Sequence, residues 1–203
     1  MKTMKKIAST GIIACAFVFG LASCGGNQTN DSVDQAQERN EEQFSGSEME
    51  DQKTNQSDFM TKAASSNMLE VEAGKLAQQK AQNAQVKQYA QMMVSDHTKA
   101  SEEMRSAATS KNIMLPDSMS SEHQDKLQSL RDKTGAEFDR DYMDMMVSSH
   151  DETISLFEDA AENLEDPDVK SMASAKLPTL RQHREQAQQI KDALGNNSGT
   201  AQR

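Results

Sequence analysis

The sequence has no tryptophan, and it is poor in cysteine (two residues), proline (three) and glycine (nine) for a chain of 203 residues. Two cysteines are too few for the disulfide framework of a small secreted domain. So little glycine and proline argues against a β sandwich, which needs many turns. Basic residues are also in the minority, and the formal net charge is −10. Without a basic stripe for phosphate contacts, we expect no nucleic-acid partner.

The one long apolar run of the sequence lies at the N-terminus and is flanked like a secretion signal. Three lysines fall within residues 1–6, and residues 7–22 carry no charge. This run is too short and wrongly flanked for a lasting membrane span. It ends in Leu-Ala-Ser-Cys followed by two glycines. The ending resembles a bacterial lipobox, which implies cleavage before Cys24 and attachment of a lipid to that cysteine.

A lipidated Cys24 predicts where the protein resides. Two or three acyl chains hold a protein stably on a membrane, so we expect the membrane as a partner through this anchor. Residue 25 is Gly rather than Asp, which in cells of enterobacterial type resembles retention in the outer membrane. We therefore expect a lipoprotein of the bacterial envelope, in the outer membrane and facing the periplasm. Its protein and small-molecule partners stay open.

Composition divides the chain into four segments. We expect a lipoprotein signal peptide at residues 1–23, a lipidated cysteine and disordered acidic tether at 24–56, a helical domain at 57–195 and a disordered tail at 196–203. The tether has few apolar side chains and cannot offset the entropy of ordering, although a short helix around residues 34–43 is possible.

The helical domain contains four long stretches in which apolar residues recur every three or four positions. They cover about residues 58–82, 84–111, 137–165 and 168–194. A short helix is expected in the longer connection between the second and third stretches. Pro178 should kink or split the last helix, and Gly195 should end it. The pattern predicts an all-α fold, a four-helix bundle with one crossover connection.

Three of the four histidines lie on the apolar faces of these helices, each near the middle: His97, His150 and His183. On the first helix, Glu72 falls on the apolar arc at a similar height. If the bundle closes as predicted, one carboxylate and three imidazoles converge. The fourth histidine, His123, lies on the short crossover helix and is not expected to join them.

Two of these histidines end similar segments. Residues 89–97 and 142–150 are identical at six of nine positions. Each segment begins with a tyrosine, Tyr89 or Tyr142. Met93 and Met146 each lie four residues before the histidine, on the same face of the helix.

Several segments together resemble the bacterial domain-of-unknown-function 4142 family, over about residues 58–193. They are Glu70 to Ala77, Val86-Lys87, Met93 to His97, Phe138 to Tyr142, Met146 to His150 and Leu177 to His183. The resemblance implies a ferritin-like bundle and a place in the envelope, but no established activity.

Ferritin-like di-iron proteins carry Glu-x-x-His on two helices. Here the residues three positions before the mid-helix histidines are Val94, Val147 and Leu180. The carboxylates that would bridge two irons are missing, so we expect no di-iron site despite the resemblance in fold.

Three hypotheses for function stay open at this point. A mononuclear Cu or Zn site would use His97, His150, His183 and Glu72. Possible surrounding residues are Met93, Met146, Tyr89, Tyr142 and Asp96, and the two methionines would soften the site toward Cu⁺.

In the second hypothesis, the histidines, Glu72 and the two tyrosines form a polar core layer that only fixes helix register. The third is an enzyme, but the sequence has no phosphate loop, nucleophile elbow or His-Glu-x-x-His motif. The sequence favours a non-enzymatic binding or envelope-protective module, with the metal-binding protein as the alternative.

Overall fold

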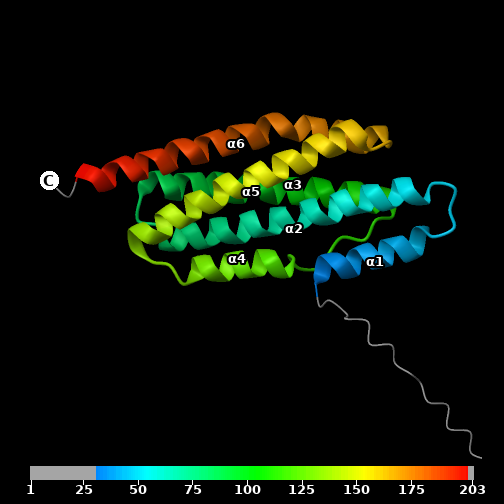
Figure 1. The fold of residues 1–203 in the computed structure, drawn as a ribbon, viewed down its shortest axis with the longest axis horizontal. Coiled ribbons are helices and arrows are strands. Elements are labelled where there is room, and N and C mark those ends of the chain that lie inside the picture. The colour runs from blue at the N-terminus through cyan, green and yellow to red at the C-terminus, as the bar shows by residue number, and fades with distance from the viewer. Residues whose placement is uncertain (1–30, 201–203) are drawn as a thin grey trace, which may run out of the picture.

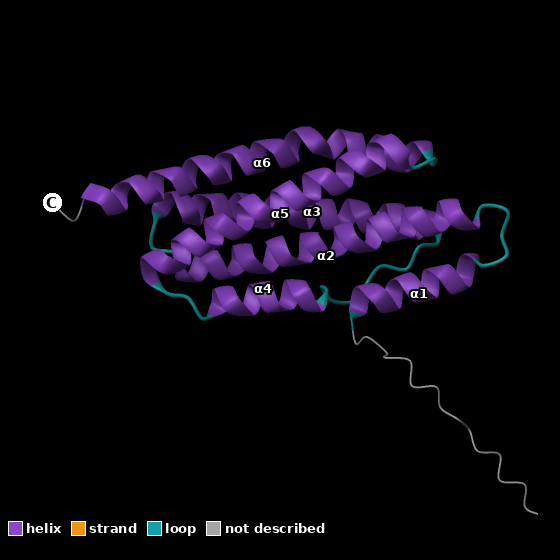
Figure 2. Ribbon diagram, in the orientation of Figure 1, coloured by secondary structure: helices purple, strands orange, loops and turns teal. Residues whose placement is uncertain are grey.

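The computed structural model describes residues 31–200, with side chains up to residue 195, and within this part of the chain it contains helices and no strand (Figures 1 and 2). The six helices are α1 (Ser32–Phe44), α2 (Glu50–Lys80), α3 (Ala84–Lys111), α4 (Ser121–Arg131), α5 (Gly135–Asn163) and α6 (Pro167–Thr200). The predicted all-α class is confirmed. None of the described helices is long and apolar enough to cross a membrane.

Two parts of the sequence prediction fall outside these residues. The predicted signal peptide, with Cys24 after it, lies before the first described residue. The end of the predicted tail, residues 201–203, lies beyond the last one.

Local signals in the sequence set the helix ends. The side chain of Asn83 accepts hydrogen bonds from the main-chain N–H groups of Gln85 and Val86, which fixes the start of α3. This helix ends at Asn112, whose left-handed backbone (φ 54°) is one that asparagine tolerates better than most residues. α5 begins at Gly135, which has φ 62°.

The four long helices α2, α3, α5 and α6 pack side by side, as two hairpins (Figure 1). Short turns join α2 to α3 and α5 to α6, whereas α3 reaches α5 through a longer connection that contains α4. This matches the predicted order of long and short helices. α1 and α4 lie end to end along α2.

The buried apolar residues form two clusters, at opposite ends of the long helices. The Tyr89/Tyr142 cluster surrounds those two tyrosines and includes Met93, Phe138 and Met146. The Phe59/Phe157 cluster includes Met60, Met104, Ile113, Leu180 and Phe44 of α1. Its central pair of rings packs edge to face, with centroids 5.0 Å apart.

The prediction of a disordered tether is wrong for residues 32–56, which form α1, a turn and the start of α2. The short helix allowed around residues 34–43 lies within α1. The few apolar side chains of α1 lie on one face, where Val33, Ala36 and Phe44 are buried. Asn40 lies on the same face and bonds to the main-chain N–H and C=O of Met114. The helix is therefore held by a narrow apolar stripe and one buried amide.

The last helix also departs from the prediction. α6 continues through Pro178 without a split, and it continues through Gly195 to Thr200. Residues 196–200 are therefore helical rather than disordered. Proline removes one hydrogen bond of the helix, and the long contact of α6 with α5 outweighs that loss.

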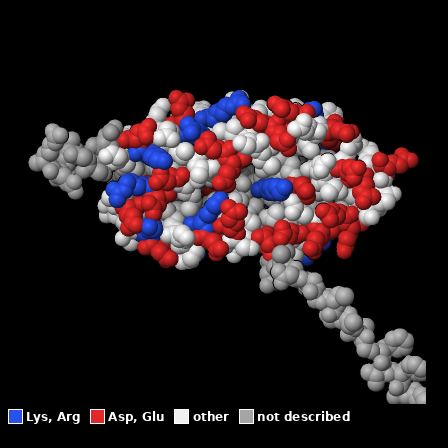
Figure 3. Space-filling view, in the orientation of Figure 1, with Lys and Arg blue, Asp and Glu red and all other residues white. Residues whose placement is uncertain are grey.

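Figure 3 shows acidic side chains spread over most of the visible face, with fewer Lys and Arg residues between them. Several basic side chains are engaged by acids, for example Lys126 with Glu122 and Lys133 with Glu137. No continuous basic surface is visible on this face.

Candidate metal centre

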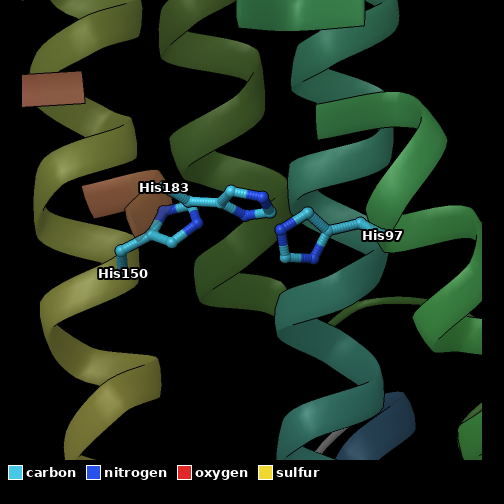
Figure 4. Close-up of side chains that lie close together, drawn as sticks. All are labelled: His97, His150 and His183. Atoms are coloured by element: carbon cyan, nitrogen blue, oxygen red, sulfur yellow. The ribbon is translucent and has the colours of Figure 1, made fainter. Parts of the chain in front are cut away.

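The rings of His97 (α3), His150 (α5) and His183 (α6) point toward one another between the four long helices (Figure 4). Their centroids are 5.5–5.6 Å apart. All three side chains are buried, with at most 3 % of their surface exposed. The structure thus brings together the three histidines that the helical spacing placed on apolar faces. They lie where the two hydrophobic clusters meet.

Each ring has one nitrogen bonded to a protein acceptor, which determines where its proton lies. The acceptors lie 2.7–3.1 Å away and are Asn67 Oδ1 for His97 Nδ1, Met146 O for His150 Nδ1 and Asp96 Oδ2 for His183 Nε2. A carbonyl or carboxylate oxygen cannot donate, so these ring nitrogens carry the hydrogen of the neutral tautomer. The opposite nitrogens keep their lone pairs.

Those opposite nitrogens are buried and have no hydrogen-bond partner among the described residues: His97 Nε2, His150 Nε2 and His183 Nδ1. Buried ring nitrogens normally find a partner, because an unpaired polar atom in the interior is costly. Three such atoms in one cluster are therefore an arrangement that calls for a ligand.

The spacing of the rings suits a single ion. One ring nitrogen from each histidine lies within 4.8 Å of the other two. For three atoms no farther apart than 4.8 Å, some point lies within about 2.8 Å of all of them. Zinc–imidazole bonds are about 2.0–2.1 Å long, so small ring rotations would bring all three nitrogens to bonding distance.

A buried carboxylate lies next to the Nδ1 atoms of two of the rings. Glu70 of α2 is fully buried, with Oε2 2.8 Å from His97 Nδ1 and Oε1 3.4 Å from His150 Nδ1. It also accepts a hydrogen bond from Ser149 Oγ at 2.9 Å. Burial favours its neutral form, but the positive charge that His97 and His150 can carry outweighs burial and lowers the pKa of Glu70 to about 2.

The pKa values of His183 and His97 are shifted in opposite directions. Burial, together with the neighbouring His97 and His150, lowers the pKa of His183 to about 4, which keeps that ring neutral near pH 7. Burial also favours the neutral form of His97, but the adjacent Glu70 carboxylate outweighs it and raises the pKa of this ring. A bound cation would need both rings neutral.

The prediction that Glu72 supplies the carboxylate is wrong. Its side chain is 40 % exposed and pairs with Lys75 at 2.7 Å. Glu70 and Glu72 are two positions apart, which places them about 200° apart around a helix. Because α2 contacts α1, α3, α4 and α5, its buried arc is wide, and the apolar residues alone did not locate the side that faces the histidines.

A signal for Glu70 was nevertheless present in small residues. Ala73, Gly74 and Ala77 follow Glu70 at three, four and seven positions, and all are buried with it. A Cβ on Gly74 would lie 2.9 Å from a methyl group of Val94, so α2 and α3 approach closely on this face. A stripe of small residues therefore marks the side of α2 that faces the site.

The residues predicted to surround the site have different places. Asp96 bonds to His183, as described above. The hydroxyl of Tyr89 donates to the main-chain oxygen of His183 at 3.2 Å, and that of Tyr142 is buried without a partner among the described residues. Met93 and Met146 are fully buried in the Tyr89/Tyr142 cluster. Burial raises the pKa of both tyrosines, so their phenols stay neutral.

The fourth histidine lies apart from the three clustered histidines, as expected. His123 of α4 shares a hydrogen bond of 2.7 Å with Ser65 Oγ, through its Nδ1. Burial lowers the pKa of His123 and keeps it neutral.

Di-iron chemistry does not fit this donor set. Among the described residues, the group of side chains able to hold an ion consists of the three histidines alone. Glu70 and Asp96 contact the rings rather than bridging two positions at the centre.

Comparison with known proteins identifies a family. No curated protein and no solved structure gives a significant match to this chain. The family model described as "Domain of unknown function (DUF4142)" matches residues 36–190, which is more than half of the sequence. The chain therefore belongs to the DUF4142 family.

Proposed function

We propose that this protein binds one divalent transition-metal ion, Zn²⁺ or Cu²⁺, through His97, His150 and His183. One observation carries the proposal: three buried ring nitrogens face one another with no partner in residues 31–195, and the opposite nitrogen of each ring is bonded to an acceptor. Metal-ligating histidines are usually oriented in this way, by an acceptor on the nitrogen away from the metal.

The alternative of a purely structural polar layer fits the same residues less well. A layer of that kind is favourable when its members satisfy one another. Here each ring leaves one buried nitrogen unpaired among the described residues. A metal ion would satisfy all three at once.

Charge and donor type support a divalent ion. The carboxylates of Glu70 and Asp96 lie behind the rings, and two negative charges balance a 2+ ion in a buried site. Three imidazole donors suit Zn²⁺ or Cu²⁺, whereas thioether sulfur would shift the preference toward Cu⁺. Met93 and Met146 are packed in the Tyr89/Tyr142 cluster, which removes the reason for Cu⁺.

The proposal includes the architecture and location predicted from the sequence. The four long helices and the crossover containing α4 support a ferritin-like four-helix bundle. The N-terminal run and the lipobox-like ending support a lipid anchor on Cys24, in the outer membrane of the envelope. In an enterobacterial host, the full chain should fractionate with membranes and the Cys24→Ala variant should not.

Metal titration of the purified protein tests the site directly. We expect one equivalent of Zn²⁺ or Cu²⁺ by elemental analysis. Free metal at 100 times Kd should raise the free energy of unfolding by about 2.7 kcal/mol. Each of His97→Ala, His150→Ala and His183→Ala should abolish tight binding.

The matched control is His123→Ala, which removes the one histidine outside the cluster and should leave both stoichiometry and affinity unchanged. Absence of stoichiometric metal in the wild-type protein would overturn the proposal. Equal loss of binding in all four histidine variants would do the same.

A further inference from the structure

A cavity of about 260 Å³ opens beside the histidine layer, between α3 and α6. Two of the candidate ligands, His97 and His183, form part of its wall. Apolar side chains of the Phe59/Phe157 cluster line part of the remainder, Met104, Phe157 and Leu180, and polar or charged side chains line much of the rest. The volume is enough for several water molecules or one small organic molecule.

Polar groups in the cavity wall have unused bonding capacity. Thr153 is about 95 % buried, lines the cavity, and its hydroxyl has no partner among the described residues. Lys176 also lines the cavity, paired with Glu103 across it. Lys99 is a second cation in the wall. The carboxylates of the wall are already engaged, Asp96 by His183 and Glu103 by Lys176.

Three histidines do not complete the coordination of Zn²⁺ or Cu²⁺. Structural zinc sites are closed by four protein ligands, whereas sites with three keep a position for water or an exogenous ligand. The described residues supply no fourth ligand within the cluster. The cavity, which His97 and His183 border, is the space from which such a ligand can reach the ion.

Resting on the proposed metal site, we propose that the open coordination position faces this cavity and takes a small anionic ligand. The anion binds the metal at one end, accepts a hydrogen bond from Thr153 and lies near the charge of Lys176, which keeps its pair with Glu103. The apolar wall strengthens these charge interactions by lowering the local dielectric. The site is then a receptor for a small anion rather than a closed metal store.

Copper and azide are suitable probes. Cu²⁺ binds nitrogen sites more tightly than the other divalent first-row ions, so it reports on this position whether zinc or copper is the natural ion. Azide is a small anion that gives a charge-transfer band on binding Cu²⁺. We expect the copper-loaded protein to develop this band saturably, with one azide per copper.

Two variants connect the band to the cavity. Ala100 lines the cavity without being a ligand, and Ala100→Phe should reduce azide affinity at least tenfold while copper affinity is kept. The control is Thr98→Phe, at an exposed position of the same helix, which should bind azide like wild type. Lys176→Met should weaken azide binding roughly tenfold, and Lys191→Met, at a lysine that pairs with Asp144 away from the cavity, should not.

The outcomes separate this inference from the metal site itself. Copper binding with a spectrum that azide does not change overturns the inference and leaves the metal site standing. Failure to bind copper at all overturns both. Unchanged azide affinity in Ala100→Phe places the ligand elsewhere. If that variant does not fold, unchanged azide affinity in Lys176→Met decides against the inference.

Discussion

The segments 89–97 and 142–150 are nearly the same in sequence but serve the histidine layer in different ways. Both place a tyrosine and a methionine in the same core cluster, and both end in a histidine whose Nε2 has no hydrogen-bond partner within the described part of the chain. His97 Nδ1 bonds to Asn67 of α2, on another helix. His150 Nδ1 bonds to the main chain of its own helix, at Met146.

The residue before the histidine differs between the two segments, and in each segment it makes a further hydrogen bond to the polar network around the rings. Asp96 is half-exposed and holds His183 of α6. Its counterpart Ser149 is buried and donates to Glu70 of α2. The shared residues thus build the packing and the ligands, while the position before the histidine gives the polar network a charged acceptor in one segment and a neutral donor in the other.

Placing the acid of the first segment in the second tests this difference most severely. Ser149→Asp would bury a second carboxylate against Glu70, and we expect the free energy of unfolding to fall by about 3–5 kcal/mol. Chemical denaturation measures the loss. The neighbouring exposed position gives the control, because Ser148→Asp should stay within about 0.5 kcal/mol of wild type. An unchanged midpoint for Ser149→Asp would mean that Glu70 is not charged and buried as described.

The reverse exchange should act on metal binding. Asp96→Ser removes the acceptor that orients His183, so we expect metal affinity to fall about 10–100-fold. Unfolding of the metal-free protein should change little, since Asp96 is half-exposed. Calorimetric titration measures the affinity, with Asp144→Ser as the control at an exposed acid of α5. Equal affinities for the two variants would contradict the orienting role of Asp96.

Replacing the tyrosines at the start of the segments should have the smallest effect on the free energy of unfolding. Tyr89→Phe loses the hydrogen bond to the main chain of His183 and should lower the free energy of unfolding by about 0.5–1.5 kcal/mol. The hydroxyl of Tyr142 has no partner among the described residues, so Tyr142→Phe should be neutral or slightly stabilising. Denaturant unfolding of the metal-free proteins compares them, and a larger loss for Tyr142→Phe would reverse this assignment.

The helical repeat predicted that the three histidines face the interior, because this periodicity can be seen in the sequence itself. His97, His150 and His183 each lie in step with apolar neighbours, and any packing of those faces brings them inward. Glu70 did not follow from the same reasoning. Its helix is covered on several sides, so the direction of the site depends on contacts with other helices.

The short helix allowed around residues 34–43 corresponds to α1, but its ordered packing on the bundle was missed for a related reason. Its composition is that of a disordered segment, and its order depends on Phe44 entering the Phe59/Phe157 cluster and on Asn40 bonding to the distant Met114. Neither contact is local in sequence, so neither is visible to a composition argument. The length of α6 shows the opposite case, where the local stop signal at Pro178 was overridden by the packing of α6 against α5.

The placement of the three histidines has a consequence for how the chain holds itself together. His97 belongs to the first hairpin, and His150 and His183 belong to the second. An ion bound as proposed would tie the two hairpins by coordinate bonds, joining positions that are far apart along the chain. Beyond Cys24 the sequence has no thiol with which to make a disulfide. The imidazoles would then provide the cross-link that cysteine does not, and this cross-link would form only when the metal ion is available.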